Sequence, residues 1–574
     1  MSCARITVTL PYRSAKTSIQ RGITHCPALL RPRFSACTPL ASAVPLSSTP
    51  LINGDNSPLK NTHQHVEERS SKRREYLLEE TARKLQRNDT ESVEKLKLID
   101  NIQRLGIGYY FEDAIDAVLR SPFSAEEEED LFTAALRFRL LRHNGIQVTP
   151  EIFLKFKDER GEFDESDTLG LLSLYEASNL GVTGEEILEE AMEFAEPRLR
   201  RSLSELAAPL RSEVAQALDV PRHLRMARLE ARRFIEQYGK QSDHDGDLLE
   251  LAILDYNQVQ AQHQSELTEI TRWWKQLGLV EKLGFGRDRA LECFMWTMGI
   301  LPHPKYSSSR IESAKAAALL YVIDDIFDTY GKMDELILFT DAIRRWDLEA
   351  MEGLPEYMKI CYMALYNTTN EICYRVLKDT GRIALPYLKS VWIETIEAYM
   401  VEVKWFSGGS APKLEEYIEN GASTVGAYMV LVHLFFLIGE GLTHQNVLFF
   451  KQKPYHKPFS AAGRIFRLWD DLGTSQEEEE RGDMASSIRL FMKEYKLSTV
   501  EEARSCVLEE ISRLWKDLNE GLISIKDALP LTIVKVALNI ARTSQVVYKH
   551  EQHTYMLSVD NYVEALFFTP LLSS

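Results

Sequence analysis

Three aspartates interrupt an apolar stretch near the middle of the chain, at positions 324, 325 and 328. Residues 319–323 before them are apolar or aromatic, and Asp324 and Asp328 stand four apart, so on a helix they share one face. Like charges at that spacing repel each other, and a bound divalent cation reverses the sign of the interaction. Because Mg²⁺ prefers hard carboxylate oxygens and completes its octahedron with water and phosphate oxygens, the pattern predicts a magnesium site at Asp324, Asp325 and Asp328.

A second line of oxygen ligands begins at Asp470. Thr474 follows four residues later and Glu478 eight residues later, again on one helical face. Arg467 lies one turn before Asp470 and could hold an anion against the same metals. Acidic helices are common, so this spacing alone is weak evidence. Together with the first array it predicts a second all-oxygen metal site.

Helices must position both arrays. From about residue 60 nearly to the end, apolar residues recur at helical spacing, and strands with period-two alternation are hard to find. We therefore expect an all-α protein. All eight tryptophans lie between Trp273 and Trp515, beside most of the recognisable chemistry. This asymmetry indicates two helical domains, one over 55–277 and one over 278–574 that holds both arrays.

The first 54 residues differ in composition from the rest. They contain no Asp or Glu, six Lys or Arg and thirteen Ser or Thr. No apolar segment of the secretory type follows the basic residues, so the stretch is typical of an organelle transit peptide. We expect residues 1–54 to direct the chain to the plastid and to be removed there.

The overall charge excludes some functions. At −17, the chain is a poor candidate for binding nucleic-acid phosphates. No uncharged apolar run reaches the roughly 18 residues that a membrane-spanning helix needs. We therefore expect neither a nucleic-acid partner nor a membrane span.

The motifs resemble those of a known family. Residues 324–328, Asp-Asp-Ile-Phe-Asp, are similar to the aspartate-rich motif of plant class I terpene synthases, and residues 470–478 to their second metal-binding motif. Arg287 and Arg289 stand where the family has its Arg-x-Arg element. The resemblance extends from about residue 60 to the C-terminus. It implies a non-catalytic N-terminal α-barrel-like domain over 55–277 and a catalytic, metal-binding class I terpenoid synthase α-bundle over 278–574. It also implies a monomeric enzyme.

The resemblance also implies a mechanism and a set of site residues. About three Mg²⁺ ions, with Mn²⁺ as an alternative, would bind the diphosphate of a small prenyl diphosphate substrate and promote its departure as an allylic cation forms. The implied metal ligands are Asp324, Asp325, Asp328, Asp470, Thr474 and Glu478. The implied catalytic residues are Asp324, Asp328, Arg287 and Arg467. The implied substrate-binding residues are Arg287, Arg289, Asp324, Asp328, Arg467, Asp470 and Trp296, the last in the apolar pocket, although a plain core tryptophan is the alternative.

Three departures from the family pattern concern the product. The tandem arginine Arg73-Arg74 is present, but Arg83 occupies the position of the tryptophan that many cyclic-monoterpene synthases carry. Ser486 replaces a common lysine, and His553 replaces a common aspartate. These departures resemble the subfamily that makes acyclic products, and they predict a linalool synthase acting on geranyl diphosphate.

Other readings stay open. Within the same class the product could be myrcene or ocimene, or nerolidol made from farnesyl diphosphate. A chain-elongating prenyltransferase or a non-catalytic helical scaffold would be a different class of protein. Residues 420–426 contain two glycines and two hydroxyl residues in an otherwise apolar pattern. They align with a kinked helix whose carbonyls face the cation in this family, and close helix packing explains the same pattern equally well.

Overall fold

The computed structural model describes residues 58–87, 91–121, 129–408, 411–481, 486–525, 528–549 and 562–572, with side chains from residue 71 onward except over 475–481. The chain divides into two compact units, Met1–Glu67 and Glu68–Ser574. The first unit contributes only the start of α1 (Pro58–Gln86) to the described part. Within the described residues there is one isolated β-bridge, between Lys157 and Phe163, and no strand, so the all-α prediction is confirmed.

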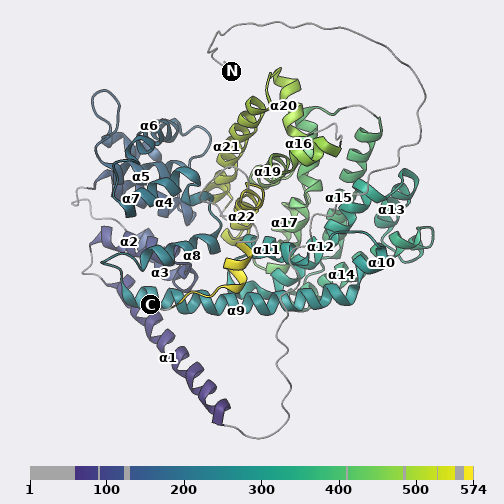
Figure 1. Ribbon diagram of the computed structural model, residues 1–574, viewed down its shortest axis with the longest axis horizontal. Helices are drawn as coiled ribbons and strands as arrows, with labels where there is room; N and C mark the ends of the chain where they lie inside the picture. Colours follow the sequence, from purple (N-terminus) through teal and green to yellow (C-terminus); the bar gives the residue numbers. More distant parts are fainter. Residues whose placement is uncertain are drawn as a thin grey trace, which may run out of the picture. The chain divides into compact units, whose positions relative to one another are not determined.

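The N-terminal half of the second unit is built from short helices that end in one long one (Figure 1). They are α2 (Ser92–Arg104), α3 (Glu112–Arg120), α4 (Leu131–His143), α5 (Thr168–Ser178), α6 (Glu186–Ser202), α7 (Ala208–Asp219), α8 (Ala227–Tyr238) and α9 (Gly246–Leu277).

The C-terminal half is a bundle of longer helices (Figure 1). They are α10 (Leu279–Leu283), α11 (Ala290–Ile300), α12 (Ser307–Asp325), α13 (Met333–Arg345), α14 (Glu356–Thr380), α15 (Leu385–Gly408), α16 (Leu414–Thr424), α17 (Ala427–Ile438), α18 (His444–Leu448), α19 (Lys457–Arg481), α20 (Ser487–Tyr495), α21 (Val500–Ser524) and α22 (Leu531–Tyr548).

Helix α9 spans both halves. Asp245 caps its N-terminus by accepting hydrogen bonds from the backbone N–H groups of residues 247 and 248, and Gly278, in the left-handed region at φ 60°, ends it. Tyr256 packs into a core cluster of the N-terminal half, whereas Ile270 and Trp274 pack into the core of the bundle. The proposed division at residue 277 therefore follows a helix end, and the two halves share α9 as a common support.

A buried ion pair fixes α12 against α9. Arg310 on α12 is fully buried, and its Nε and Nη2 donate to the two carboxylate oxygens of Glu266 on α9 at 2.8 and 2.6 Å. Its Nη1 donates to the carbonyl oxygens of Leu301 and His303 at 3.0 and 2.6 Å. Because such a pair is costly to break once it is desolvated, α12 is held in one position at its N-terminal end. The three aspartates lie at the other end of this helix.

The most apolar helical segment is bent. Helices α16 and α17 meet at an angle of 41°, and together, by length and composition only, they resemble a membrane span. No single helix in the described part is both long enough and apolar enough to cross a membrane. Gly426 stands at the bend with φ 78°, and a Cβ there would lie 2.2 Å from Leu320 Cδ2. The bend and a close approach to α12 therefore both depend on this glycine.

Candidate active site

The aspartate motif sits at the end of α12. Asp324 and Asp325 belong to its last turn, and Asp328 lies in a π-helical turn over Ile326–Tyr330. The regular α-helical spacing expected from the sequence is therefore widened at this point, a change that is frequent at functional sites. Ile326 and Phe327 are buried, which anchors the turn and leaves the Asp328 side chain exposed.

Arg287 binds the first two aspartates. It lies between α10 and α11, and its Nη2 donates to Asp324 Oδ2 at 2.7 Å while its Nε lies 2.8 Å from Asp325 Oδ1. Its backbone N–H donates to Asp325 Oδ2 at 3.0 Å. The structure thus brings Arg287 to the motif. Arg289 instead pairs with Glu292 in the first turn of α11, with 2.8 Å between Nη1 and Oε1.

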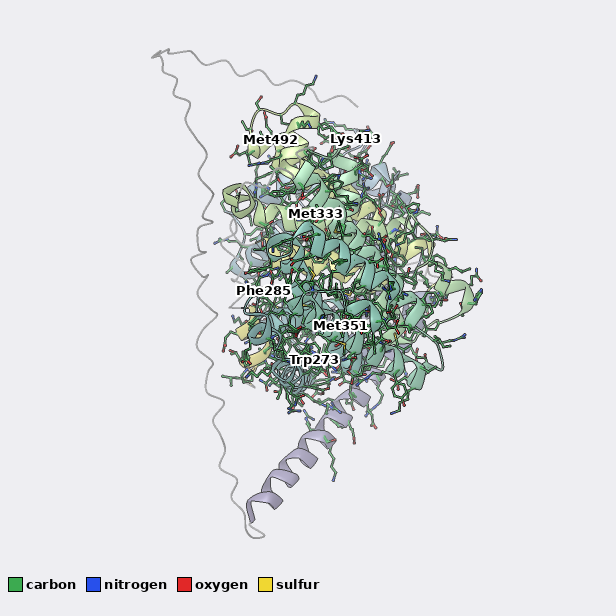
Figure 2. The ribbon with its side chains drawn as sticks, turned by 90° about the vertical axis from the view of Figure 1, so that its right-hand side faces the viewer. Trp273, Phe285, Met333, Met351, Lys413 and Met492 are labelled. Atoms are coloured by element: carbon green, nitrogen blue, oxygen red, sulfur yellow. The ribbon has the colours of Figure 1, made fainter. Side chains whose placement is uncertain are left out.

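An aromatic pair lies beside Arg287. The ring of Phe285 stacks on that of Tyr330, with 4.0 Å between centroids, and so connects the loop before Arg287 to the π turn. Figure 2 shows Phe285 and Met333 on the same side of the molecule, and Met333 is 37% exposed. This side of the bundle carries the motif.

The second array lies on α19. Arg467 forms ion pairs with both Asp470 and Asp471. The Thr474 hydroxyl donates to the carbonyl oxygen of Asp470 at 2.8 Å. Glu478 belongs to the same helix, but its side chain lies outside the described part. The structure therefore places Arg467 against Asp470 and Asp471, and its role in binding an anion stays a prediction.

The two arrays act on each other electrostatically. Burial and the neighbouring carboxylates of Asp325 and Asp470 raise the pKa of Asp324, although Arg287 opposes them. A carboxyl group that is hard to ionise beside other carboxylates indicates a local shortage of positive charge. No group of three His, Cys, Asp or Glu side chains among the described residues stands close enough to hold a metal ion. Arg287 and Arg467 occupy carboxylates of both arrays, yet the donor set and its charge fit a divalent cation.

Asp471 was not assigned a role by the sequence patterns, because its neighbour Asp470 carries the motif. Its side chain is fully buried. Besides pairing with Arg467, it accepts hydrogen bonds from the Tyr417 hydroxyl at 3.1 Å and from the Ser487 backbone N–H at 2.8 Å. Asp471 therefore anchors Arg467 and the start of α20 at one point.

The sequence patterns did not assign a role to Glu402 on α15 either. Its Oε1 accepts from the Thr424 hydroxyl at 2.8 Å and from Asn420 Nδ2 at 3.3 Å. Burial raises its pKa to about 7 against the opposing charge of Arg467, and Asp324 adds to the rise. No local spacing in the sequence indicates this residue, since its neighbours come from α12, α16 and α19.

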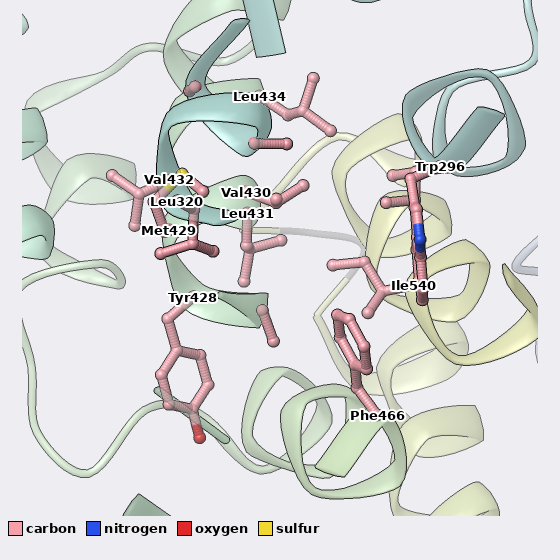
Figure 3. Close-up of a cluster of buried hydrophobic side chains, with 14 of the residues drawn as sticks. Trp296, Leu320, Tyr428, Met429, Val430, Leu431, Val432, Leu434, Phe466 and Ile540 are labelled. Carbon is pink, nitrogen blue, oxygen red and sulfur yellow. The ribbon is translucent and has the colours of Figure 1, made fainter. Parts of the chain in front are cut away.

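The apolar part of the site is lined by aromatic rings. Trp296 on α11 stacks on Phe466 of α19, with centroids 4.7 Å apart, and Tyr548 on α22 lies 6.0 Å from Trp296 and 6.3 Å from Phe466. Figure 3 shows Trp296, Phe466 and Ile540 pointing toward one another. Aromatic faces can stabilise a cation. Trp296 is only 6% exposed, so it serves the core as well as this aromatic group.

Residues 420–426 form both a kink and a close helix contact at the bend between α16 and α17. The helix is broken after Thr424, whose carbonyl oxygen accepts from the Tyr399 hydroxyl at 2.8 Å. Close packing is present too, because a Cβ on Gly421 would lie 2.3 Å from Arg467 Cδ. The small residues therefore permit the break and let Arg467 cross α16.

The retained Arg73 and two of the residues that depart from the family pattern, Arg83 and Ser486, have structural partners. Arg73 pairs with Asp247 and Glu250 on α9 at 3.0 and 2.6 Å, and Arg83 pairs with Glu80 on its own helix. Ser486 caps the N-terminus of α20. His553 lies outside the described residues.

Comparison with known proteins gives consistent matches. Residues 51–218 match the terpene synthase N-terminal domain and residues 275–517 the metal-binding domain of the terpene synthase family. The chain is 82% identical over 569 residues to a chloroplastic geraniol synthase of Ocimum basilicum, covering 99% of this chain and 100% of the relative. It is 60% identical over 542 residues to a chloroplastic monoterpene synthase of Cananga odorata, covering 93% of this chain and 92% of the relative.

Two solved structures are similar along most of their length. Isoprene synthase from grey poplar, in complex with three Mg²⁺ ions and dimethylallyl-S-thiolodiphosphate, has a TM-score of 0.83 and 38% identity, covering 88% of this chain and 97% of that one. Limonene synthase with 2-fluorolinalyl diphosphate has a TM-score of 0.82 and 38% identity, covering 88% and 95%.

Proposed function

The chain belongs to the terpene synthase family, and we propose that it converts geranyl diphosphate and water into geraniol and diphosphate. The geraniol synthase of Ocimum basilicum and the monoterpene synthase of Cananga odorata both support a monoterpene synthase. The product rests on one observation, the 82% identity over the full length of a geraniol synthase. Linalool, expected from the departures at Arg83, Ser486 and His553, is not supported, and geraniol replaces it.

The change of product is chemically small. Geraniol and linalool arise from the same geranyl cation, whose charge is shared between C1 and C3. Water attack at C1 gives geraniol, attack at C3 gives linalool, and proton loss gives myrcene or ocimene. About 1.4 kcal/mol separates each tenfold step in product ratio. Residue types at the three departures cannot resolve such a difference, because it depends on where one water molecule lies.

Divalent metal use follows from the metal-binding domain, and we assign its ligands to the two arrays. Asp324, Asp325 and Asp328 would hold the ions on one side, and Asp470, Thr474 and Glu478 on the other. Bound Mg²⁺, or Mn²⁺ in its place, neutralises the diphosphate and makes it a better leaving group. About three ions are proposed, the number in the grey poplar isoprene synthase complex.

The arginines supply fixed positive charge to the same end of the site. Arg287 and Arg467 each pair with carboxylates of one array. When those carboxylates are engaged elsewhere, both guanidiniums are free to bind the departing diphosphate in a bidentate manner, and Arg289 is placed to assist from the same loop. Asp471 keeps Arg467 from leaving the site.

The aromatic group guides the allylic cation. Trp296, Phe466 and Tyr548 present rings around the apolar side of the site, which favours positive charge and limits the access of bulk water. A single water must still reach C1 for geraniol to form.

Location and assembly complete the proposal. The acid-free leader and the chloroplastic relatives agree on the plastid. We propose a monomer whose partner is its small-molecule substrate.

Labelled water tests the proposed reaction. The protein started at residue 55 is incubated with geranyl diphosphate and Mg²⁺ in H₂¹⁸O, and the organic layer is analysed by gas chromatography and mass spectrometry. Geraniol carrying ¹⁸O is expected, because the C1–O bond breaks and water supplies the new oxygen. Unlabelled geraniol would indicate cleavage of the P–O bond by a phosphatase and would contradict the proposal. Linalool, a hydrocarbon or a cyclic product as the main compound would also overturn it.

A further inference from the structure

Tyr321 is influenced electrostatically by residues of both arrays. It stands three residues before Asp324 on α12, and its side chain is half-buried among neighbours that are mostly buried. The guanidinium carbon of Arg287 lies 5.2 Å from the centre of its ring. Burial, then Cys293 on α11, Asp470 on α19 and Asp324 raise the pKa of Tyr321, while Arg287 lowers it. The phenol is therefore within electrostatic reach of both the aspartate motif and the second array.

The hydroxyl of Tyr321 has no hydrogen-bond partner in the described part of the chain. Other tyrosines around the site are engaged: Tyr399 donates to the carbonyl of Thr424, and Tyr417 to Asp471. A tyrosine hydroxyl enclosed by protein normally finds a partner. Because the Tyr321 side chain keeps partial access to the site, that partner is expected to be a water molecule or the substrate.

We propose that the Tyr321 hydroxyl holds the water molecule that attacks C1 of the geranyl cation, an inference that rests on the proposed function. C1 is the carbon that carries the diphosphate. In the proposed function, the diphosphate binds Arg287 and the metal ions that Asp324 and Asp470 would hold. Arg287 lies beside the phenol, and Asp324 and Asp470 act on it electrostatically. A water bound to Tyr321 is therefore on the C1 side of the allylic cation. C3 lies farther along the prenyl chain of the substrate, toward the aromatic rings of Trp296, Phe466 and Tyr548.

The step balances without another reactant. The bond between C1 and the diphosphate oxygen breaks with both electrons going to the diphosphate. The water, which donates one hydrogen bond to the phenol oxygen, directs a lone pair at C1 and forms the new C–O bond. The resulting oxonium ion gives its proton to the released diphosphate. Tyr321 keeps its own proton throughout, in agreement with the raised pKa of its phenol, so it is a positioning residue for the water rather than a base.

Two other polar residues fit this role less well. Tyr548 is near the same rings, but Asp470, as a charge and as a hydrogen-bond acceptor, already engages its hydroxyl. Glu402 already accepts hydrogen bonds from Thr424 and Asn420. Of these three residues, Tyr321 is the one whose polar atom has no hydrogen-bond partner among the residues that the structure describes.

Tyr321→Phe removes only the hydroxyl. Since the variant loses no intramolecular hydrogen bond, its unfolding temperature should stay at the wild-type value. Release of diphosphate should stay within about threefold of the wild-type rate, because ionisation precedes water capture. The ratio of geraniol to myrcene, ocimene and linalool together should fall about tenfold, the worth of one hydrogen bond to the water.

Tyr362→Phe on α14 is the matched control. It also removes one tyrosine hydroxyl, but that hydroxyl donates to the carbonyl of Asp347 at 2.9 Å. This control should lower the unfolding temperature and leave the product ratio unchanged.

The outcomes separate this inference from the proposed function. A wild-type enzyme that makes no geraniol would overturn the proposed function whatever the variant does. A geraniol-forming wild type whose Tyr321→Phe variant keeps the same product ratio would overturn the role of Tyr321. A higher KM for geranyl diphosphate with unchanged products would also overturn it, since that result assigns the hydroxyl to substrate binding.

Discussion

Replacing Asp471 by asparagine should disable the enzyme although Asp471 is not a proposed metal ligand. One carboxylate oxygen, Oδ1, accepts from the Tyr417 hydroxyl at 3.1 Å and also pairs with Arg467. The other, Oδ2, accepts from the Ser487 backbone N–H at 2.8 Å. The side chain is fully buried, so water cannot replace a lost partner. The substitution is nearly isosteric, and its effect comes from hydrogen bonding and charge.

Neither orientation of the new amide satisfies its neighbours. If the amide nitrogen takes the place of Oδ2, it faces the Ser487 N–H, which can only donate. If it takes the place of Oδ1, it faces Arg467, which can also only donate. A buried unsatisfied donor costs about 1–3 kcal/mol, and the charge-assisted bond to Arg467 contributes about 1.5–3 kcal/mol. Displacement of Arg467 should therefore lower kcat/KM about a hundredfold, equivalent to about 2.7 kcal/mol.

The assay compares Asp471→Asn with Tyr417→Phe. The latter removes one donor and leaves Arg467 and Ser487 in place, at a cost of about 1 kcal/mol. Steady-state kinetics with geranyl diphosphate and thermal unfolding are measured for both variants. Asp471→Asn should show the larger loss of kcat/KM and the lower unfolding temperature. If its kcat/KM matched that of Tyr417→Phe, Asp471 would not hold Arg467 in its working position, and the reasoning would be refuted.

Three further predictions follow from the site and from the core. Asp324→Ala and Asp328→Ala should each abolish Mg²⁺-dependent turnover with helical circular dichroism unchanged; wild-type turnover in either would remove the metal assignment. Gly426→Ala should destabilise the fold by about 1–3 kcal/mol, because a Cβ would meet Leu320 at 2.2 Å on a backbone with φ 78°. Gly246→Ala is the control and should not destabilise the fold, since no described atom lies within 4 Å of the added Cβ. Equal unfolding temperatures for the two variants would contradict the packing argument. Burial, with Arg542, lowers the pKa of His223 to about 3, so the unfolded chain alone binds a proton below pH 6.5. The free energy of unfolding should consequently fall by about 1.4 kcal/mol from this residue between pH 7.5 and 5.5, and a stability that rises on acidification would refute it.

The local chemistry of this protein is readable from its sequence. Asp324, Asp325 and Asp470 are recognisable because ligand spacing along a helix is a local property, repeated every three or four residues. The all-α class follows for the same reason, since apolar periodicity is also local. The pairing of Arg467 with Asp470 is a contact within one turn, and spacing alone predicts it.

Contacts between segments that are far apart in the sequence cannot be predicted from residue spacing along one helix. Arg287 reaches Asp324 and Asp325 from another segment, and Asp471 gains its importance from Tyr417 and Ser487, which lie on or beside other helices. The widening of α12 into a π turn at Asp328 has no signature in residue spacing.

What the sequence by itself determined is the helical class, the spacing of the two carboxylate arrays and, through their motifs, the family. Only the tertiary structure decided which groups stand together at the end of α12, including Arg287 beside the ring of Tyr321. The physical reason is that ligand spacing is encoded within one helix, whereas the position of a water molecule depends on how α11, α12, α19 and α22 pack around a common interior. Product identity depends on that packing.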